Sequence, residues 1–234
     1  MAKQQKLLAV DTNAKTVKGQ KVGYMTGILY MIPNDTICPA SKIAGCREGC
    51  LVSAGRGVMS PVKAGRAKKT AFYHDDKNAF YAKLRKECEA LVKRAEKKGM
   101  IPAIRLNGTS DIDHTDFIAS LPDIQFYDYT KRIDIVRKAK AIPNYHITFS
   151  YSSKDRYAKY VKEAVELGAN LAVIFRKKEL PEFFMGLPVV NGDETDLRFL
   201  DKGHVVVGLY AKGKMKKDTS GMVVDLPSGV IAIA

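Results

Sequence analysis

Short apolar runs that alternate with helix-like segments constrain the fold of this chain more than any other feature. The runs have the length and the β-branched or aromatic content of strands, and they cover residues 22–32, 102–106, 124–127, 145–149, 171–175, 188–190 and 204–209. Segments with helical spacing or helix-compatible composition lie between several of them, at residues 75–98, 113–121, 133–140 and 154–167. This alternation predicts βαβ units and a mostly parallel sheet of about seven strands.

Polar residues follow nearly every run directly. The carboxyl ends of parallel strands meet at one edge, where (β/α) barrels assemble their active sites, whereas a doubly wound sheet concentrates its site at one switch point. The chain contains neither a glycine-rich dinucleotide motif nor a P-loop. We therefore expect an α/β fold that is a full or partial (β/α) barrel of mostly parallel strands.

The chain has 234 residues, enough for one substantial core. We expect a single domain over residues 1–234, with a basic N-terminal segment at 1–21 and the barrel-like core at 22–234. The first 22 residues contain five lysines and match neither a secretory signal nor a membrane anchor. These features predict a cytoplasmic protein without membrane association, in the host cytoplasm if a phage encodes it.

Three cysteines, Cys38, Cys46 and Cys50, lie in one loop after the first predicted barrel strand. Structural disulfides are rare in the cytoplasm, so these cysteines are better explained as metal ligands or reactive thiols. Their spacings of seven and three residues lack the Cys-x-x-Cys pair of many zinc sites, while iron–sulfur clusters accept more varied spacings. We expect a four-iron cluster, with zinc or unligated thiols as alternatives. Cys88 has the spacing of a buried helical face and is interpreted as a core residue.

The formal net charge of +14 is unevenly distributed. Residues 1–100 contain 20 Lys and Arg against 8 Asp and Glu, whereas residues 101–234 contain 19 against 17. Such an excess attracts polyanions, although a solvated, solubilising surface explains it equally well. Candidate nucleic-acid or phosphate contacts follow the cysteine loop or lie near the C-terminus: Arg56, Lys63, Arg66, Lys68, Lys69, Lys212 and Lys214.

Two further sets of strand-end residues are candidate sites. Asp128, Tyr129 and Lys131 combine a carboxylate, a phenol and an ammonium group, which suits the orientation of a polar substrate or proton transfer. Asn107, Ser110 and Asp111 follow another strand and are candidates for cofactor binding. Asp193 belongs to an acidic group that contacts ribose hydroxyls or, as a somewhat better explanation, forms an internal salt-bridge network.

A strand followed by a three-cysteine loop, in a parallel barrel with polar strand ends, resembles the radical S-adenosylmethionine superfamily. The resemblance implies a four-iron cluster on Cys38, Cys46 and Cys50, whose free iron chelates S-adenosylmethionine. It also implies cofactor contacts at Asn107, Ser110 and Asp111.

A closer resemblance covers most of the chain and is to a family of bacteriophage and prophage proteins with a three-cysteine loop. It is based on residues 26–30, 38–57, 105–111, 125–131 and 193–200. It implies a phage setting rather than an activity.

Two functions from different classes remain open. The first is an iron–sulfur enzyme of radical S-adenosylmethionine-like type that acts on a nucleic acid or nucleotide. The second is a non-catalytic, basic nucleic-acid-binding phage protein in which the cysteines hold zinc or no metal.

Overall fold

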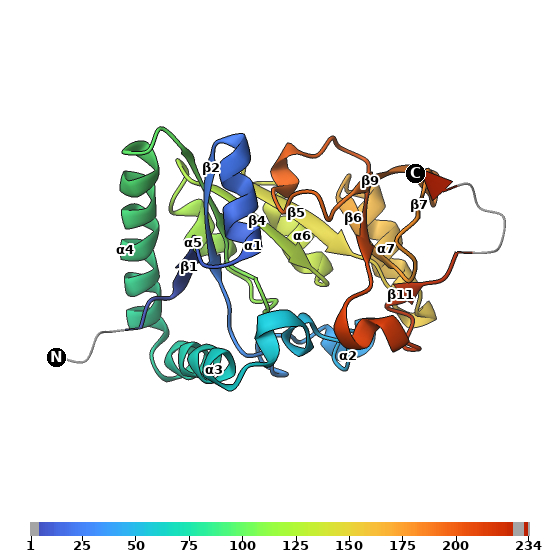
Figure 1. Ribbon diagram of the computed structural model, residues 1–234, viewed down its shortest axis with the longest axis horizontal. Coiled ribbons are helices and arrows are strands. Elements are labelled where there is room, and N and C mark those ends of the chain that lie inside the picture. The colour runs from blue at the N-terminus through green and yellow to red at the C-terminus, as the bar shows by residue number, and fades with distance from the viewer. Residues whose placement is uncertain (1–4, 227–231, 234) are drawn as a thin grey trace.

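The computed structural model describes residues 5–226 and 232–233, and its centre is a ten-stranded, mostly parallel sheet (Figure 1). Residues 1–4 of the predicted basic segment lie outside the described residues. The strand order is β1-β2-β3-β4-β5-β6-β10-β9-β8, with β11 also paired to β6. The strands are β1 (Leu8–Val10), β2 (Tyr24–Leu29), β3 (Ile101–Arg105), β4 (Gln125–Thr130), β5 (Tyr145–Ser150), β6 (Asn170–Phe175), β8 (Phe183–Phe184), β9 (Leu187–Asn191), β10 (Val206–Tyr210) and β11 (Val223–Val224). A separate two-stranded sheet joins β7 (Leu180–Pro181) to β12 (Ala232–Ile233).

The sheet is open, so the closed barrel is not formed. Strands β2 to β6 are parallel and follow one another in chain order, as they do in a barrel. Closure would require the outer edge of β2 to bond to the last parallel strand, but antiparallel β1 occupies that edge. At the other end, β9 pairs with the antiparallel two-residue strand β8. The seven predicted strands are nevertheless all present, and the mixed α/β, mostly parallel class is confirmed.

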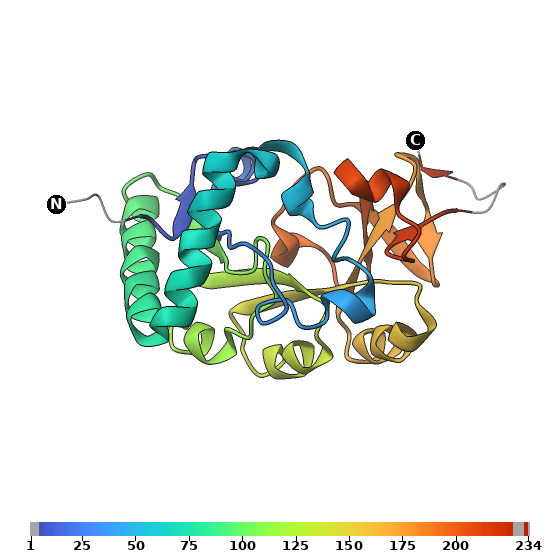
Figure 2. The ribbon, with the colours of Figure 1, turned by 90° about the horizontal axis from the view of Figure 1, so that it is seen from below.

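Helices cover one face of the sheet. Figure 2 shows α5, α6 and α7 in a row along this face, and α4 packs against β2 and β3 at its left end. We call this the helix face and the opposite side, covered by α1 and η4, the inner face. The helices are α1 (Ala14–Lys18), α2 (Ser41–Ala44), α3 (Ser60–Asp75), α4 (Lys77–Glu96), α5 (Thr115–Ala119), α6 (Ile133–Ala139) and α7 (Asp155–Glu166), and the 3₁₀ turns are η1 (Gly19–Val22), η2 (Leu51–Ser53), η3 (Gly55–Val58), η4 (Arg198–Leu200) and η5 (Gly213–Lys217).

Helix α4 illustrates how local sequence sets an element. Its N-cap is Asp76, whose carboxylate accepts a hydrogen bond of 2.8 Å from the backbone N–H of Ala79. One face is buried with helical spacing, and Cys88 lies on it among apolar neighbours, as predicted. Burying each large apolar side chain of such a face contributes about 1.5–3 kcal/mol.

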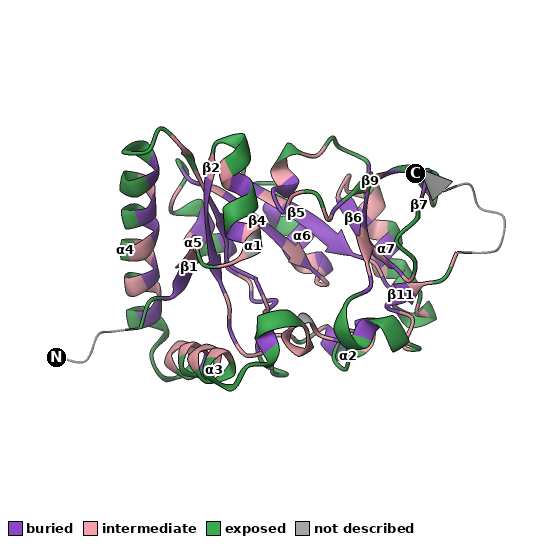
Figure 3. Cartoon of the chain, in the orientation of Figure 1, coloured by how far each residue is buried: buried purple, intermediate pink, exposed green. Residues whose placement is uncertain are grey.

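The strands divide their side chains between the two faces (Figure 3). In β4, Phe126 belongs to the main core on the helix face, whereas Tyr127 packs with Ala103 and Leu197 on the inner face. The strand period of two residues causes this division. Both faces of the central strands are therefore buried.

Helix α3 is the largest element that sequence patterning missed. Only Thr70 is fully buried in its sixteen residues, so the helix presents no periodic apolar face to detect. Its one local signal was Pro61 in the first turn. No helix in the described part of the chain is long and apolar enough to cross a membrane.

Candidate functional site

The loop with the three cysteines crosses the carboxyl edge of the sheet. In Figure 1 it lies with α2 and α3 along the lower edge of the molecule. Ile37 accepts a 2.8 Å hydrogen bond through its carbonyl from the N–H of Asp111, which ties the loop to the segment after β3. Ser220 donates a 2.8 Å hydrogen bond to the carbonyl of Gly45, which ties it to the segment before β11.

Two glycines allow this loop to pack closely against its neighbours. Gly45 has φ +84°, a left-handed conformation that glycine adopts without strain. A Cβ at Gly49 would lie 2.3 Å from the sulfur of Met215, so a larger residue there would displace the Met215 side chain. The close packing of the loop against η5 has this physical basis.

Cys38, Cys46 and Cys50 converge with Asp111 and Lys131, and we call these five residues the cysteine group. None of the three thiols is in a disulfide. Burial raises the pKa of Cys38 to about 12; Lys131 opposes this shift, while Asp111, Cys50 and Cys46 add to it. Burial also raises the pKa of Cys46, again opposed by Lys131. The five side chains are therefore electrostatic neighbours, although they come from three separate segments.

Lys131 is the cation of the cysteine group. Burial alone would lower the pKa of its ammonium, but the thiols and the carboxylate of Asp111 outweigh burial, and the pKa is raised. Asp111 accepts hydrogen bonds from Thr130 Oγ1 (2.6 Å) and from the backbone N–H of Lys131 (3.0 Å). The carboxylate thus fixes the backbone from which Lys131 extends toward the thiols.

The described residues contain no preformed site for a metal ion. Within residues 5–226 and 232–233, no group of three or more His, Cys, Asp or Glu side chains is arranged to hold one. The three thiols are neighbours in one loop, but they do not present a ready-made set of ligands.

The structure separates the three residues that were predicted to act together in catalysis. Asp128 lies on the helix face, where it accepts hydrogen bonds from the N–H of Asn107 (2.6 Å) and the hydroxyl of Tyr145 (3.2 Å). Tyr129 lies on the inner face, with the guanidinium of Arg105 4.6 Å from its ring centre. Asp128 and Tyr129 are separated because successive residues of a strand point to opposite faces. Only Lys131, which follows the last residue of β4, joins the cysteine group.

The residues predicted to bind a cofactor are likewise not all at one place. Asn107 builds a turn: its side-chain oxygen accepts from Ser110 Oγ (2.8 Å) and from the N–H of Ile112 (2.9 Å). Asp111 belongs to the cysteine group. Asp193 lies after β9, where it pairs with Lys212 and accepts a hydrogen bond from the N–H of Tyr210.

The predicted phosphate-binding cations divide into two kinds. Lys69 donates to the carbonyl of Leu7 (2.7 Å), and burial lowers its pKa to about 8. Arg66 is half-buried, with its guanidinium 5.0 Å from the ring centre of Tyr30. Lys212 is exposed but paired with an acid, as described above. The remaining four are exposed on the surface: Arg56, Lys63, Lys68 and Lys214.

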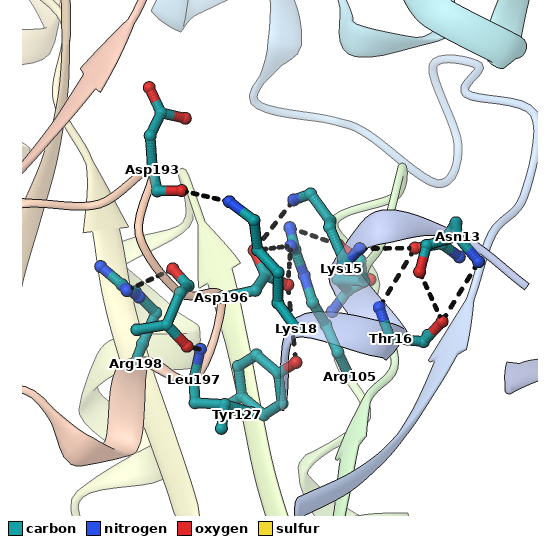
Figure 4. A network of polar contacts seen from close by, with 12 residues as sticks. Asn13, Lys15, Thr16, Lys18, Arg105, Tyr127, Asp193, Asp196, Leu197 and Arg198 are labelled. Carbon is teal, nitrogen blue, oxygen red and sulfur yellow. Dashed lines mark hydrogen bonds and ion pairs between the residues drawn. The ribbon is translucent and has the colours of Figure 1, made fainter. Parts of the chain in front are cut away.

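An ion network on the inner face includes Asp196, a member of the acidic group that was predicted to form internal salt bridges (Figure 4). Asp196 lies between Arg105, whose Nη1 is 3.0 and 3.1 Å from its two oxygens, and Lys15, whose Nζ is 2.9 Å away. The hydroxyl of Tyr127 is 3.5 Å from the same carboxylate. We call Lys15, Arg105 and Asp196 the inner ion network. Its two basic members were not predicted, although Arg105 is a charged residue within the apolar run 102–106.

Polar atoms without partners gather around this network. Nine buried side-chain nitrogen and oxygen atoms lack a hydrogen bond within the described part of the chain. Seven of them lie on the inner face or in the segment that covers it, on Thr26, Arg105, His146, Thr148, Arg198 and Asp201. Two of the seven, Arg198 Nη1 and Asp201 Oδ2, form an ion pair at 3.2 Å, so five lack any partner among the described residues. Buried polar groups without partners are uncommon in native proteins, so this concentration marks a region suited to water or a polar ligand.

Comparisons with known proteins place the chain in a family without assigning an activity. No curated protein and no solved structure matches it. The family model described as "Gene product 88" matches residues 5–226, which is nearly the whole chain. This match confirms the predicted phage-type family and adds nothing for the resemblance to radical S-adenosylmethionine enzymes. The chain therefore belongs to the Gene product 88 family.

Proposed function

We propose that Cys38, Cys46 and Cys50 hold a four-iron cluster, and that the chain is an enzyme of radical S-adenosylmethionine-like type acting on a nucleic acid or nucleotide. One observation carries the proposal: three thiols of one loop lie near a half-buried lysine at the carboxyl edge of a parallel sheet. Sites of (β/α) folds are built at this edge. The sequential order of β2 to β6, which barrels share, supports the comparison.

The chain's own residues would divide the work around such a cluster. The three cysteines would act as its ligands, and the ammonium of Lys131 would offset part of the negative charge of the thiolates. Asp111 would act as a positioning residue, because it binds the backbone N–H of Lys131. Packing of Cys46 against Ala211, Met215 and neighbouring apolar side chains would limit access of water.

The cofactor assignment follows from the number of protein ligands. Three thiolates leave one iron of a four-iron cluster free, and that iron would supply the binding point for S-adenosylmethionine and its reductive cleavage. Asn107 and Ser110 hydrogen-bond to each other, so Asp111 and Lys131 are the better candidates for contacts to such a cofactor.

Iron analysis of anaerobically prepared protein tests the proposal. After reconstitution with ferrous iron and sulfide, the wild type should bind about four iron atoms per chain and become brown. Cys46→Ser should bind much less. Cys88→Ser is the matched control, because Cys88 is buried in α4, outside the cysteine group, and its iron content should equal that of the wild type. A colourless, iron-free wild type, or equal iron in Cys46→Ser, would rule the cluster out.

A second candidate function is favoured by the exposed cations of η3 and α3. Arg56, Lys63 and Lys68 are exposed there, and they would bind nucleic-acid phosphates in a non-catalytic protein whose cysteines hold zinc or no metal. Lys63→Ala/Lys68→Ala should then reduce the slope of log affinity against log salt by about two. Lys86→Ala on α4 is the exposed control. Weak binding that does not respond to salt would exclude this function.

A further inference from the structure

The inner ion network carries more positive than negative charge. Lys15 and Arg105 share the single carboxylate of Asp196. Arg105 and Asp196 are only 5% and 9% exposed at their side chains, whereas the side chain of Lys15 is 40% exposed. An uncompensated charge away from water is unfavourable. An anion beside Arg105 would therefore be stabilised.

A third cation lies near this pair. The guanidinium of Arg66 is 5.0 Å from the ring centre of Tyr30, and the pKa of Tyr30 is raised by burial against the opposing effects of Arg105 and Arg66. The buried carboxyl of Asp128 also acts on Arg105, and burial raises its pKa to about 7, so it offsets part of the positive charge. A positive surplus remains, which suits the charge of about −1.5 to −2 that a terminal phosphate carries at neutral pH.

Unpartnered donors at the network also point to a ligand. The Nε of Arg105 makes no hydrogen bond within the described residues, although the side chain is buried. His146 Nε2 and the hydroxyls of Thr26 and Thr148 are unpartnered on the same face. Guanidinium groups bind phosphate through paired N–H donors, and hydroxyls add further hydrogen bonds.

Lysines lie at the solvent-facing side of the network. The side chain of Lys15 is 40% exposed, so it reaches from the surface to Asp196. Lys18 donates a 2.6 Å hydrogen bond to the carbonyl of Asp193, and Lys212 pairs with the carboxylate of the same residue (Figure 4 shows Lys15, Lys18 and Asp193). A row of exposed lysines raises the local concentration of an anion.

We propose that Lys15, Arg66 and Arg105 form a binding site for the terminal phosphate of a nucleotide or of a nucleic-acid strand end. The inference deepens the proposed function by naming the phosphate-recognising residues. Phosphate binding itself does not require the cluster.

Titration calorimetry with deoxyadenosine 5′-monophosphate in phosphate-free, low-salt buffer tests the site. The wild type should bind the monophosphate and not deoxyadenosine. Lys15→Met should weaken binding at least tenfold, and so should Arg66→Met. The control is Lys86→Met, which removes an exposed lysine of α4 and should bind as the wild type does.

An oligonucleotide with and without a 5′-phosphate distinguishes the two phosphate sources. Tighter binding of the phosphorylated strand than of the nucleotide assigns the site to a strand end, and the reverse assigns it to a free nucleotide. Absence of binding by the wild type, or equal affinities of Lys15→Met and Lys86→Met, overturns the proposal. Cys46→Ser should lose iron and still bind phosphate, so failure of the cluster and failure of this site are separable.

Discussion

The two faces of the sheet differ in how fully their buried polar side chains are hydrogen-bonded. On the helix face, Asp128 and Thr130 have hydrogen-bond partners within β3, β4 and β5 or the turns that follow them. On the inner face, the neighbouring strands contribute His146 and Thr148, whose polar side-chain atoms include unpartnered ones. Polar groups with complete partners hold the architecture together. Those without partners have capacity left for another molecule, and this difference separates structural residues from candidate binding residues.

Of the substitutions that test this difference between the faces, Arg105→Met should lower the free energy of unfolding most. It leaves Asp196 buried with Lys15 as its one remaining cation, and we expect the free energy of unfolding in urea to fall by about 3–5 kcal/mol. The double variant Arg105→Met/Asp196→Asn should recover more than half of this loss, because it leaves no buried carboxylate that has lost its arginine partner. A single variant as stable as the wild type would show that the inner ion network is not a buried pair.

Asp128→Asn tests the helix face through pH. Burial raises the pKa of Asp128 from 3.8 to about 7, so the folded state holds its proton more tightly than the unfolded state. The stabilisation that the protonated carboxyl of Asp128 contributes is fully present below pH 4 and is lost as the pH rises through 7. The asparagine variant should lack this loss and gain on the order of 2–4 kcal/mol relative to the wild type between pH 4 and pH 8. Parallel stability curves for the two proteins would contradict the assignment.

Valine variants of two matched threonines should give the smallest changes in the free energy of unfolding, and the two changes should differ clearly from each other. Thr130 and Thr148 are both almost fully buried in strands. Thr130 donates to Asp111 (2.6 Å), so Thr130→Val should destabilise the protein by about 1–2 kcal/mol. The hydroxyl of Thr148 has no hydrogen-bond partner among the described residues, so Thr148→Val should be neutral or stabilise by up to about 1 kcal/mol. Thermal unfolding in phosphate-free buffer measures both, and equal losses would erase the distinction between the faces.

Much of the fold could be predicted because strands that are buried in a parallel sheet appear in the sequence as continuous apolar runs. The run at 145–149 corresponds to β5 and the run at 171–175 to β6. Helix α3 could not be predicted in the same way, because its partners on the rest of the molecule bury only Thr70 completely. The open sheet could not be predicted either, because β1 has only three residues and its pairing with β2 depends on the tertiary fold.

The candidate site was predictable only where residues are close in the chain. The three cysteines share one loop, and their convergence follows from that loop. The structure does not bring Asp128, Tyr129 and Lys131 together, because Asp128 and Tyr129 are adjacent in β4 and point to opposite faces, while Lys131 lies beyond the end of the strand. Arg105 and Asp196 are 91 residues apart, so their contact depends on the path of the segment after β9 and leaves no local pattern.

The salt bridge from α1 to the segment after β9 orders events during synthesis of the chain. Lys15 and Asp196 are 181 residues apart, so α1 leaves the ribosome long before its partner exists. Strands β2 to β6 can assemble in the meantime, since each pairs with the strand made just before it. The inner face of β2 to β5 is therefore still open when those strands have formed, and a nascent chain exposes it to solvent until residues 193–201 arrive.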